Sequence, residues 1–367
     1  MRFIPLEVKD GIELTAYNSV EVTKNYFLVK DNLGKAVMLY DRDGRFIKKI
    51  SYKKLGKEFY PSYDEHSNSL VFLAVNKNYT LTPRDKLKIM LDWNNPRNKK
   101  YYKKYVINLD DTLFVIKKEV PQQNDILRAH YLYDSLYWQS QINTSGLYKD
   151  SLGYELKIYK DNQLVNGFFP YNRINEARFL YSEESAGVSS TDTKEINFVT
   201  RPYCDTIYKM IGDNISPVYQ LVLPLENSLP SSFYTKPFKN KTDFENFRRN
   251  NGWMLRQIYS VYETPRFLYF SVGYFSNYEF YIYQKQNKVT YKAKNIKPDS
   301  SQYNIQVLSD YFSSRKDDRF YRPQKAGDLM AFFEKNKNIA VPKELEEFFK
   351  SNPPAATPVI LEFKLKN

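Results

Sequence analysis

The chain has 367 residues and a formal net charge of +13, from 55 Lys or Arg and 42 Asp or Glu. Its mean hydropathy is −0.62, and no apolar run approaches the ~20 residues that a membrane-spanning helix needs. A chain of this length usually holds two or three domains, but all-β propellers of this length fold as one. The single cysteine, Cys204, excludes an intrachain disulfide.

The positive charge permits nucleic acid, an anionic glycan or an anionic membrane surface as a partner. The basic residues, however, are spread along the whole chain with acids among them, which favours a Lys-rich solvated surface. No motif of a known nucleic-acid fold is present, so we expect no specific nucleic-acid binding.

Short strand-like runs joined by polar turns repeat from one end of the chain to the other. Lys35–Ile50 predicts a hairpin, because Asp43-Gly44 supplies the positive φ angles of a tight turn. Tyr154–Phe169 predicts two strands around Asp161-Asn162, and Glu195–Leu223 predicts three, with turns at Arg201-Pro202 and Gly212-Asp213-Asn214. Arg256–Lys294 holds four in series. Antiparallel strands in groups of about four are typical of a propeller.

We therefore predict an all-β, six-bladed β-propeller that forms a single domain over residues 1–367. Its blades are predicted at residues 11–54, 57–120, 126–172, 177–225, 253–296 and 302–367. The N-terminal strand Phe3–Val8 and the C-terminal strand Val359–Lys366 each lack a sequential neighbour. Pairing these two strands closes the ring of blades and removes two exposed edges.

Three short helical insertions are also predicted. In Lys241–Asn250, Thr242 is the expected N-cap and Glu245 completes a capping box. Pro342–Lys350 begins with proline and acids, as helices often do. Asp328–Lys335 is the third.

Four segments resemble the Bacteroidetes six-bladed β-propeller family, whose relatives are the NHL and TolB-like propellers. They are Leu39–Ile50, Arg201–Met210, Tyr262–Val272 and Thr357–Asn367. The resemblance implies a secreted or lipid-anchored protein of the cell envelope, and it offers no catalytic residue to carry over. The chain begins in a strand-like run with no leader at Met1, as expected of a cytosolic protein or of one whose leader has been removed.

Motifs of catalytic chemistry are scarce. The two histidines, His66 and His130, fall in different predicted blades, and no metal-binding, phosphate-binding or nucleophile motif occurs. Cys204 is expected to be an inert thiol. Acid pairs such as Asp110-Asp111, Glu183-Glu184 and Asp317-Asp318 are expected at turns or on solvated faces. We predict no catalytic residue, no metal site and no cofactor.

Candidate ligand-binding residues lie in loops expected at one end of the central channel. Asn76–Lys104 holds nine Lys or Arg, two Asp, and interleaved aromatic residues that include Trp93. Cations beside aromatic rings suit an anionic glycan, although a solvated insertion is an alternative interpretation. The loop Arg201–Asp205 is expected at the same end. Arg201, Tyr203 and Asp205 are therefore predicted to line the channel mouth with Trp93, unless Asp205 only caps a turn.

These features predict a monomeric, non-enzymatic binding protein of the cell envelope, whose ligand is a glycan or a partner protein. One alternative is a propeller hydrolase or lyase acting on polysaccharide, which would need two converging carboxylates and a raised pKa. The other is a scaffold for protein–protein interaction, which would carry an exposed apolar patch.

Overall fold

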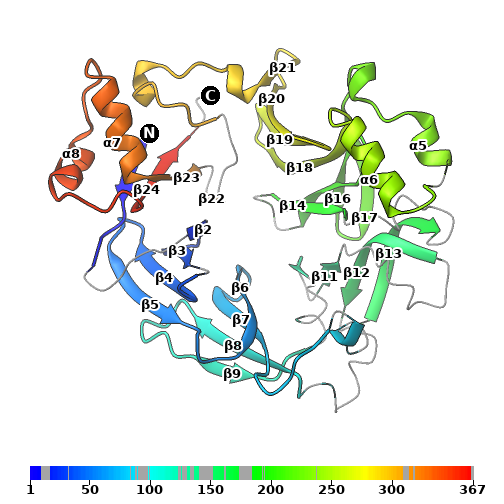
Figure 1. The fold of residues 1–367 in the computed structure, drawn as a ribbon, viewed down its shortest axis with the longest axis horizontal. Coiled ribbons are helices and arrows are strands. Elements are labelled where there is room, and N and C mark those ends of the chain that lie inside the picture. The colour runs from blue at the N-terminus through cyan, green and yellow to red at the C-terminus, as the bar shows by residue number, and fades with distance from the viewer. Residues whose placement is uncertain are drawn as a thin grey trace. The chain divides into compact units, whose positions relative to one another are not determined.

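The fold is described from a computed structural model. The residues described are 1–9, 17–31, 33–82, 84–86, 89, 98, 100–122, 125, 130–132, 136–139, 152–160, 163–172, 184–191, 193, 195–236, 238–308, 314–316 and 319–364. They contain six sheets, each of four antiparallel strands. The chain is a six-bladed β-propeller, as predicted (Figure 1).

The chain divides into two compact units of three blades each. Unit 1 comprises residues 1–126, 297–307 and 311–367. Its first two blades are β2 (Tyr17–Val22), β3 (Tyr26–Asp31), β4 (Ala36–Asp41) and β5 (Phe46–Ser51), then β6 (Lys57–Asp64), β7 (Ser69–Val75), β8 (Tyr102–Asn108) and β9 (Lys117–Glu119). Its third blade is β22 (Ser314–Lys316), β23 (Arg319–Lys325), β24 (Pro358–Phe363) and β1 (Arg2–Pro5).

Unit 2 comprises residues 127–296 and 308–310. Its first blade is β10 (His130–Tyr131), β11 (Leu136–Gln139), β12 (Leu152–Lys160) and β13 (Gln163–Asn172). Its second is β14 (Gly187–Ser190), β15 (Ile196–Thr200), β16 (Thr206–Ile211) and β17 (Asn214–Gln220). Its third is β18 (Leu255–Glu263), β19 (Phe267–Tyr274), β20 (Tyr278–Gln284) and β21 (Val289–Lys292). The single domain over residues 1–367 stays a prediction.

The N- and C-terminal strands close the last blade of unit 1. Strand β1 pairs antiparallel with β24, with Phe3 opposite Leu361 and Pro5 opposite Val359. This confirms the pairing predicted from the two unpartnered terminal strands. The predicted hairpin at Gly44 also forms, with φ of +86°. A Cβ atom at Gly44 would lie 2.2 Å from the Pro5 carbonyl oxygen, so the turn fits against β1 only with glycine.

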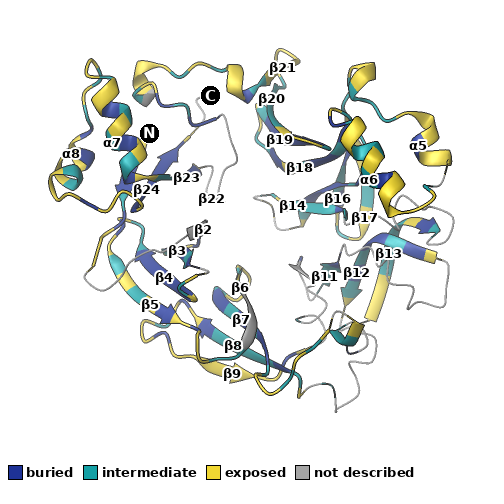
Figure 2. Ribbon diagram, in the orientation of Figure 1, coloured by how far each residue is buried: buried dark blue, intermediate teal, exposed yellow. Residues whose placement is uncertain are grey.

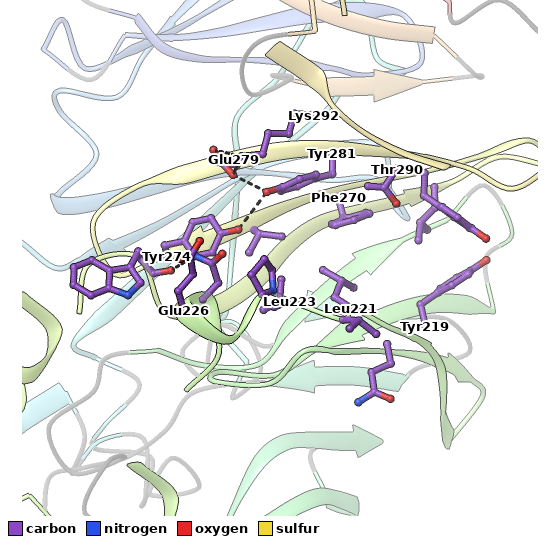
Figure 3. Close-up of a pocket in the computed structure, with 18 of the residues that line it drawn as sticks. Tyr219, Leu221, Leu223, Glu226, Phe270, Tyr274, Glu279, Tyr281, Thr290 and Lys292 are labelled. Carbon is purple, nitrogen blue, oxygen red and sulfur yellow. Dashed lines mark hydrogen bonds and ion pairs between the residues drawn. The ribbon is translucent and has the colours of Figure 1, made fainter. Parts of the chain in front are cut away.

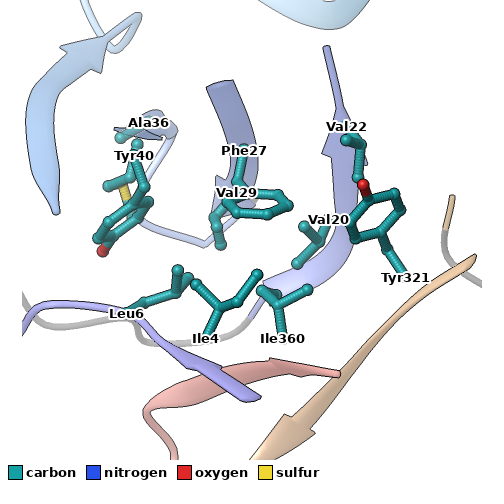
Figure 4. Packing of buried hydrophobic residues seen from close by; sticks show 11 residues of the cluster. Ile4, Leu6, Val20, Val22, Phe27, Val29, Ala36, Tyr40, Tyr321 and Ile360 are labelled. Carbon is teal, nitrogen blue, oxygen red and sulfur yellow. The ribbon is translucent and has the colours of Figure 1, made fainter. Parts of the chain in front are cut away.

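A packed cluster joins the first and last blades of unit 1 (Figure 4). Phe27 from β3 and Tyr321 from β23 meet edge to face, with ring centroids 5.8 Å apart. The Arg42 guanidinium lies 4.8 Å from the centroids of both rings, and it donates to the Thr23 carbonyl (3.2 Å) and to the Tyr321 hydroxyl. The aromatic rings and the cation fill this interface completely enough that Phe27 is fully buried.

Four α-helices are described along their whole length: α5 (Ser231–Thr235), α6 (Lys241–Asn250), α7 (Ala326–Lys335) and α8 (Lys343–Lys350). The last three confirm the predicted helices, and α5 was missed. The predicted cap of α6 was wrong, because Asn240, not Thr242, accepts a hydrogen bond from the Asp243 amide (2.9 Å). Asn and Thr both serve as N-caps, and Asn240 precedes the helix by one residue. No described helix has both the length and the apolar character needed to cross a bilayer.

Burial differs between strands within a blade (Figure 2). Strand β24 is buried along its whole length, and β19 is buried except at its first residue. Strand β17 is mostly exposed. Strands β17 and β19 belong to the second and third blades of unit 2, and residues of both strands line the pocket described below.

Candidate functional site

Arg201 is held by groups of the protein itself. It forms a two-pronged hydrogen bond with the buried carboxylate of Glu155, at 3.1 and 2.7 Å, and its guanidinium lies 4.3 Å from the Phe169 ring centroid. Burial opposes the charge of Arg201, but the hydrogen bonds to Glu155 outweigh it and raise the pKa of the guanidinium. This pair joins β12 to the turn after β15, so Arg201 performs a structural task in unit 2.

Tyr203 is also enclosed. It is 3% exposed, and its ring centroid lies 5.0 Å from that of Phe233 and 6.2 Å from that of Phe275. Its amide donates to the Arg256 carbonyl (2.7 Å), and its carbonyl accepts from the Tyr234 hydroxyl (2.7 Å). Tyr203 thus belongs to an aromatic core beneath α5 and α6.

Asp205 contacts two side chains of its own blade, and the turn-capping alternative stays a prediction. Its carboxylate accepts from the Thr206 hydroxyl (3.1 Å) and from the Gln220 amide (3.4 Å). Arg201, Tyr203 and Asp205 lie in one loop of unit 2, and each contacts different residues. Trp93 falls outside the described residues, and the grouping of all four at a channel mouth stays a prediction.

A pocket with a volume of about 760 Å³ lies in unit 2, between the end of β17 with the segment after it and one face of β19–β21 (Figure 3). This volume is within the range of small-ligand sites. Its walls come from two chain segments and one sheet face. The lining residues are Tyr219, Gln220, Leu221, Val222, Leu223, Pro224, Glu226, Asn227, Trp253, Leu268, Phe270, Val272, Tyr274, Asn277, Glu279, Tyr281, Tyr283, Thr290 and Lys292.

The sheet wall of this pocket results from strand alternation and register. Phe270 on β19 is opposite Tyr281 on β20, which is opposite Lys292 on β21. Because side chains alternate across a strand, residues two apart share this face, which is why Glu279 and Tyr281 line the same wall. The rings of Phe270 and Tyr281 stack, with centroids 5.6 Å apart and planes at 14°. The wall is therefore a firm aromatic surface with a polar margin.

A polar corner, defined as Tyr274, Glu279, Tyr281 and Lys292, occupies one end of the pocket (Figure 3). The Tyr281 hydroxyl donates to Glu279 (2.6 Å), the Lys292 ammonium donates to the same carboxylate (3.0 Å), and the Tyr274 and Tyr281 hydroxyls lie 3.2 Å apart. Burial works against the charge of Glu279, but hydrogen bonds from Tyr281, Lys292 and Lys294 outweigh it and lower its pKa. Burial, and then the contact with Glu279, raise the pKa of Tyr281.

At the opposite end of the pocket, Tyr219 belongs to a second group of hydrogen-bonded polar residues. The Tyr219 hydroxyl donates to Glu263 (2.5 Å), which also pairs with Lys285 (2.6 Å). Burial, together with the hydrogen bond to Glu263, raises the pKa of Tyr219. This phenol therefore stays protonated and fixed at the pocket wall.

The mouth of the pocket is built by the insertion at residues 221–254, which joins β17 to β18. The Asn227 amide donates to the Trp253 carbonyl (2.8 Å) and so links the two legs of the insertion. The Ser276 amide and hydroxyl both bind the Gly252 carbonyl, at 2.9 and 2.8 Å, which fixes the Trp253 leg against the third blade. Trp253 is 52% exposed, whereas Val222 and Leu225 are 96% and 91% exposed.

Two carboxylates, Glu226 and Glu279, line this pocket. A glycosidase acid would need a raised pKa, but that of Glu279 is lowered. Among the residues that the structure describes, no group of three or more His, Cys, Asp or Glu side chains could hold a metal ion. The arrangement offers aromatic surface, amide groups and fixed hydroxyls, which are groups for recognition.

The sequence prediction missed this pocket. One signal was present: Leu268, Phe270, Val272 and Tyr274 alternate along a strand, and Tyr281 and Tyr283 continue the pattern on the next. Of the three acid pairs, Asp110-Asp111 lies in a turn, as predicted, whereas Glu184 is mostly buried and does not lie on a solvated face. Asp111 accepts from the Leu113 amide (2.9 Å) in a turn, whereas Glu184 is bound by Arg256 (2.6 Å). Glu183, Asp317 and Asp318 lie outside the described residues.

Comparison with known proteins supports the fold. Residues 1–63 match the model of family DUF5128, described as a 6-bladed beta-propeller. The structure of a presumed exported protein of Bacteroides fragilis is similar to this one, with 14% sequence identity and a TM-score of 0.57. The match covers 100% of this chain and 95% of the Bacteroides fragilis chain. The match to a DUF4221 family member from Bacteroides vulgatus covers 100% of this chain and 97% of that protein, at 10% identity and a TM-score of 0.49. No curated protein matches. At these identities, the likeness concerns the fold.

Proposed function

We propose that the chain is a non-enzymatic binding protein of the cell envelope, and that its ligand is a glycan held in the pocket between β17 and β19–β21. The observation that carries the proposal is the half-exposed ring of Trp253 at the mouth of an aromatic pocket. Sugars present apolar C–H faces beside hydroxyl groups, and this pocket pairs flat rings with amide, hydroxyl and charged side chains. Location in the envelope is supported by a fold shared with a presumed exported protein.

Binding is favoured over turnover by the electrostatics of the pocket. Glu279 is engaged by three donors that stabilise its charged form, so it is a poor proton donor at neutral pH. A fixed carboxylate that positions its neighbours is more consistent with recognition.

The proposal is tested by screening the purified chain on a glycan array at low and high salt, and then by calorimetric titration of each hit. Trp253→Ala is expected to weaken binding at least about tenfold, because a central aromatic anchor carries much of the affinity of a site. Tyr291→Ala is the matched control, since Tyr291 is 42% exposed and lies on the opposite face of β21. Equal affinity of the Trp253→Ala variant and the wild type would contradict the proposed site.

A partner protein is the second candidate, because Val222, which lines the pocket, and Leu225, three residues further along the chain, are almost fully exposed apolar residues. Salt-resistant glycan binding that survives Leu225→Ser, a change outside the lining of the pocket, would favour the glycan. If no glycan binds at any salt concentration, the partner protein becomes the better hypothesis.

A further inference from the structure

The hydrogen bonds of the polar corner have a fixed direction. A phenol has one proton, and Tyr281 gives its proton to the Glu279 carboxylate over 2.6 Å. The contact of 3.2 Å between the Tyr274 and Tyr281 hydroxyls therefore requires Tyr274 to be the donor. The chain of donation runs from Tyr274 to Tyr281 to Glu279.

This direction determines what the corner offers a ligand. With its proton committed to Tyr281, the Tyr274 oxygen can only accept a further hydrogen bond. The Lys292 ammonium has three N–H donors, and Glu279 is the acceptor that pairs with it, at 2.9 to 3.0 Å. Lys292 is 41% exposed, so its remaining donors are within reach of a ligand. One wall of the pocket thus presents an acceptor, Tyr274, and a donor, Lys292, at the two ends of the hydrogen-bond chain that runs through Tyr281 and Glu279.

Contacts with neighbouring residues fix the polar corner in position. Phe270 stacks on Tyr281, and Tyr281 is opposite both Phe270 and Lys292 in the sheet register. Tyr274 is 5% exposed and its amide binds the Asn277 carbonyl (2.8 Å). Glu279 pairs with both Lys292 and Lys294, so it offsets only part of their positive charge. The Lys292 ammonium keeps further N–H donors, which an uncharged hydroxyl can accept.

We infer that this corner recognises two neighbouring hydroxyl groups on one sugar ring, one donating to the Tyr274 oxygen and the other accepting from the Lys292 ammonium. The inference rests on the proposed glycan binding and names the chemistry by which the pocket selects among sugars. A site built to bond a hydroxyl discriminates against an analogue that lacks it, because the polar groups of the site are left unpaired. Tyr274 and Lys292 are then specificity-determining residues, and Tyr281 and Glu279 are positioning residues.

The test uses the full chain and methyl glycosides of glucose, galactose and mannose, each with its 2-, 3-, 4- and 6-deoxy forms. Affinities are measured by calorimetry or by ligand-observed NMR. For a parent glycoside that binds, removal of either of two neighbouring hydroxyls is expected to weaken binding roughly three- to tenfold, the effect of one partly exposed hydrogen bond. Removal of the other hydroxyls is expected to change affinity less than about twofold.

Two variants show which sugar hydroxyl binds to Tyr274 and which binds to Lys292. Tyr274→Phe is expected to abolish the penalty for one deoxy sugar, and Lys292→Gln the penalty for its neighbour. Lys288→Gln is the matched control, because Lys288 is exposed in the same hairpin and does not line the pocket. Thermal unfolding of each variant checks that the fold is retained.

The outcomes separate the two proposals. Suppose that the glycosides bind and that binding depends on Trp253. If all deoxy forms then bind with equal affinity, or if the deoxy penalties are unchanged in both variants, hydroxyl recognition by the polar corner is refuted and the proposed glycan binding stands. Absence of binding by every parent glycoside, together with a blank glycan array, would overturn both.

Discussion

Two interfaces between blades in this protein both contain packed aromatic side chains, but only one of them borders a pocket. In unit 1, the first and last blades meet through Phe27 and Tyr321, and Arg42 lies against both rings. In unit 2, the second and third blades meet through a core that includes Phe198 and Ile258. Phe270 belongs to the same core and Tyr281 packs against it, and both residues also line the pocket.

The difference arises in the connections between strands. In unit 1, Arg42 projects from the β4–β5 turn into the neighbouring blade and occupies the space beside Tyr321. In unit 2, the chain leaves β17 at Gln220 and enters the insertion at residues 221–254, which frames the space without filling it. A propeller of this kind therefore gains a pocket where a connection diverges from the blades, beside aromatic residues of the core.

The same substitution at both interfaces gives the largest expected effect. Phe27→Ala should lower the free energy of unfolding by about 3–5 kcal/mol, because it leaves a closed cavity in a packed cluster. Phe270→Ala should cost only about 1.5–3 kcal/mol, because the space joins a pocket that water already reaches. Urea unfolding monitored by circular dichroism measures both. Equal losses would show that the pocket wall is packed as tightly as the cluster.

The second largest expected effect is a loss of unfolding free energy at alkaline pH, caused by Tyr40 in the packed cluster of unit 1. Burial, and then the charge of Glu7, raise the pKa of Tyr40 in this cluster to about 12. Its stabilising effect is fully present below the unfolded pKa of about 10 and is lost as pH rises toward 12, a change of about 2 kcal/mol. Unfolding free energies at pH 9 and 12 should therefore fall less in Tyr40→Phe than in the wild type. An identical fall in the two proteins would contradict the burial of this phenol.

Acid pH should affect the pocket more weakly. The lowered pKa of Glu279 means that its contribution to stability is present above its ordinary pKa of 4.5 and is lost as pH falls through the native value. The partners Lys292 and Lys294 are partly exposed, so the effect should be below about 1 kcal/mol. Glu279→Gln should flatten this part of the pH profile between pH 6 and 3, with Glu195→Gln, an exposed turn residue, as the control. A profile that is unchanged in Glu279→Gln would exclude this contribution.

Local sequence signals predicted the fold well. Gly44 marked its hairpin, Arg201-Pro202 its turn, and the unpartnered strands at the two ends of the chain predicted the pairing of β1 with β24. Each signal acts within a few residues or through a pattern of alternation. The cap of α6 failed because two neighbouring residues, Asn240 and Thr242, satisfy the same preference.

The pocket could not be predicted in the same way. Whether Tyr281 faces Glu279, Lys292 and the opposite leg of an insertion depends on strand register and on where residues 221–254 lie, neither of which a local pattern specifies. Arg201 illustrates the same limit. Its predicted ligand-binding role stays a prediction, and no local pattern identified Glu155, 46 residues away, as the partner of its guanidinium.

The most direct test is a crystal structure of the chain grown with the oligosaccharide that binds most tightly on the array. We expect a sugar ring in the pocket between β17 and β21, with one face against Trp253 and two hydroxyls at Tyr274 and Lys292. A sugar bound elsewhere on the protein, with this pocket empty, would contradict the proposed site.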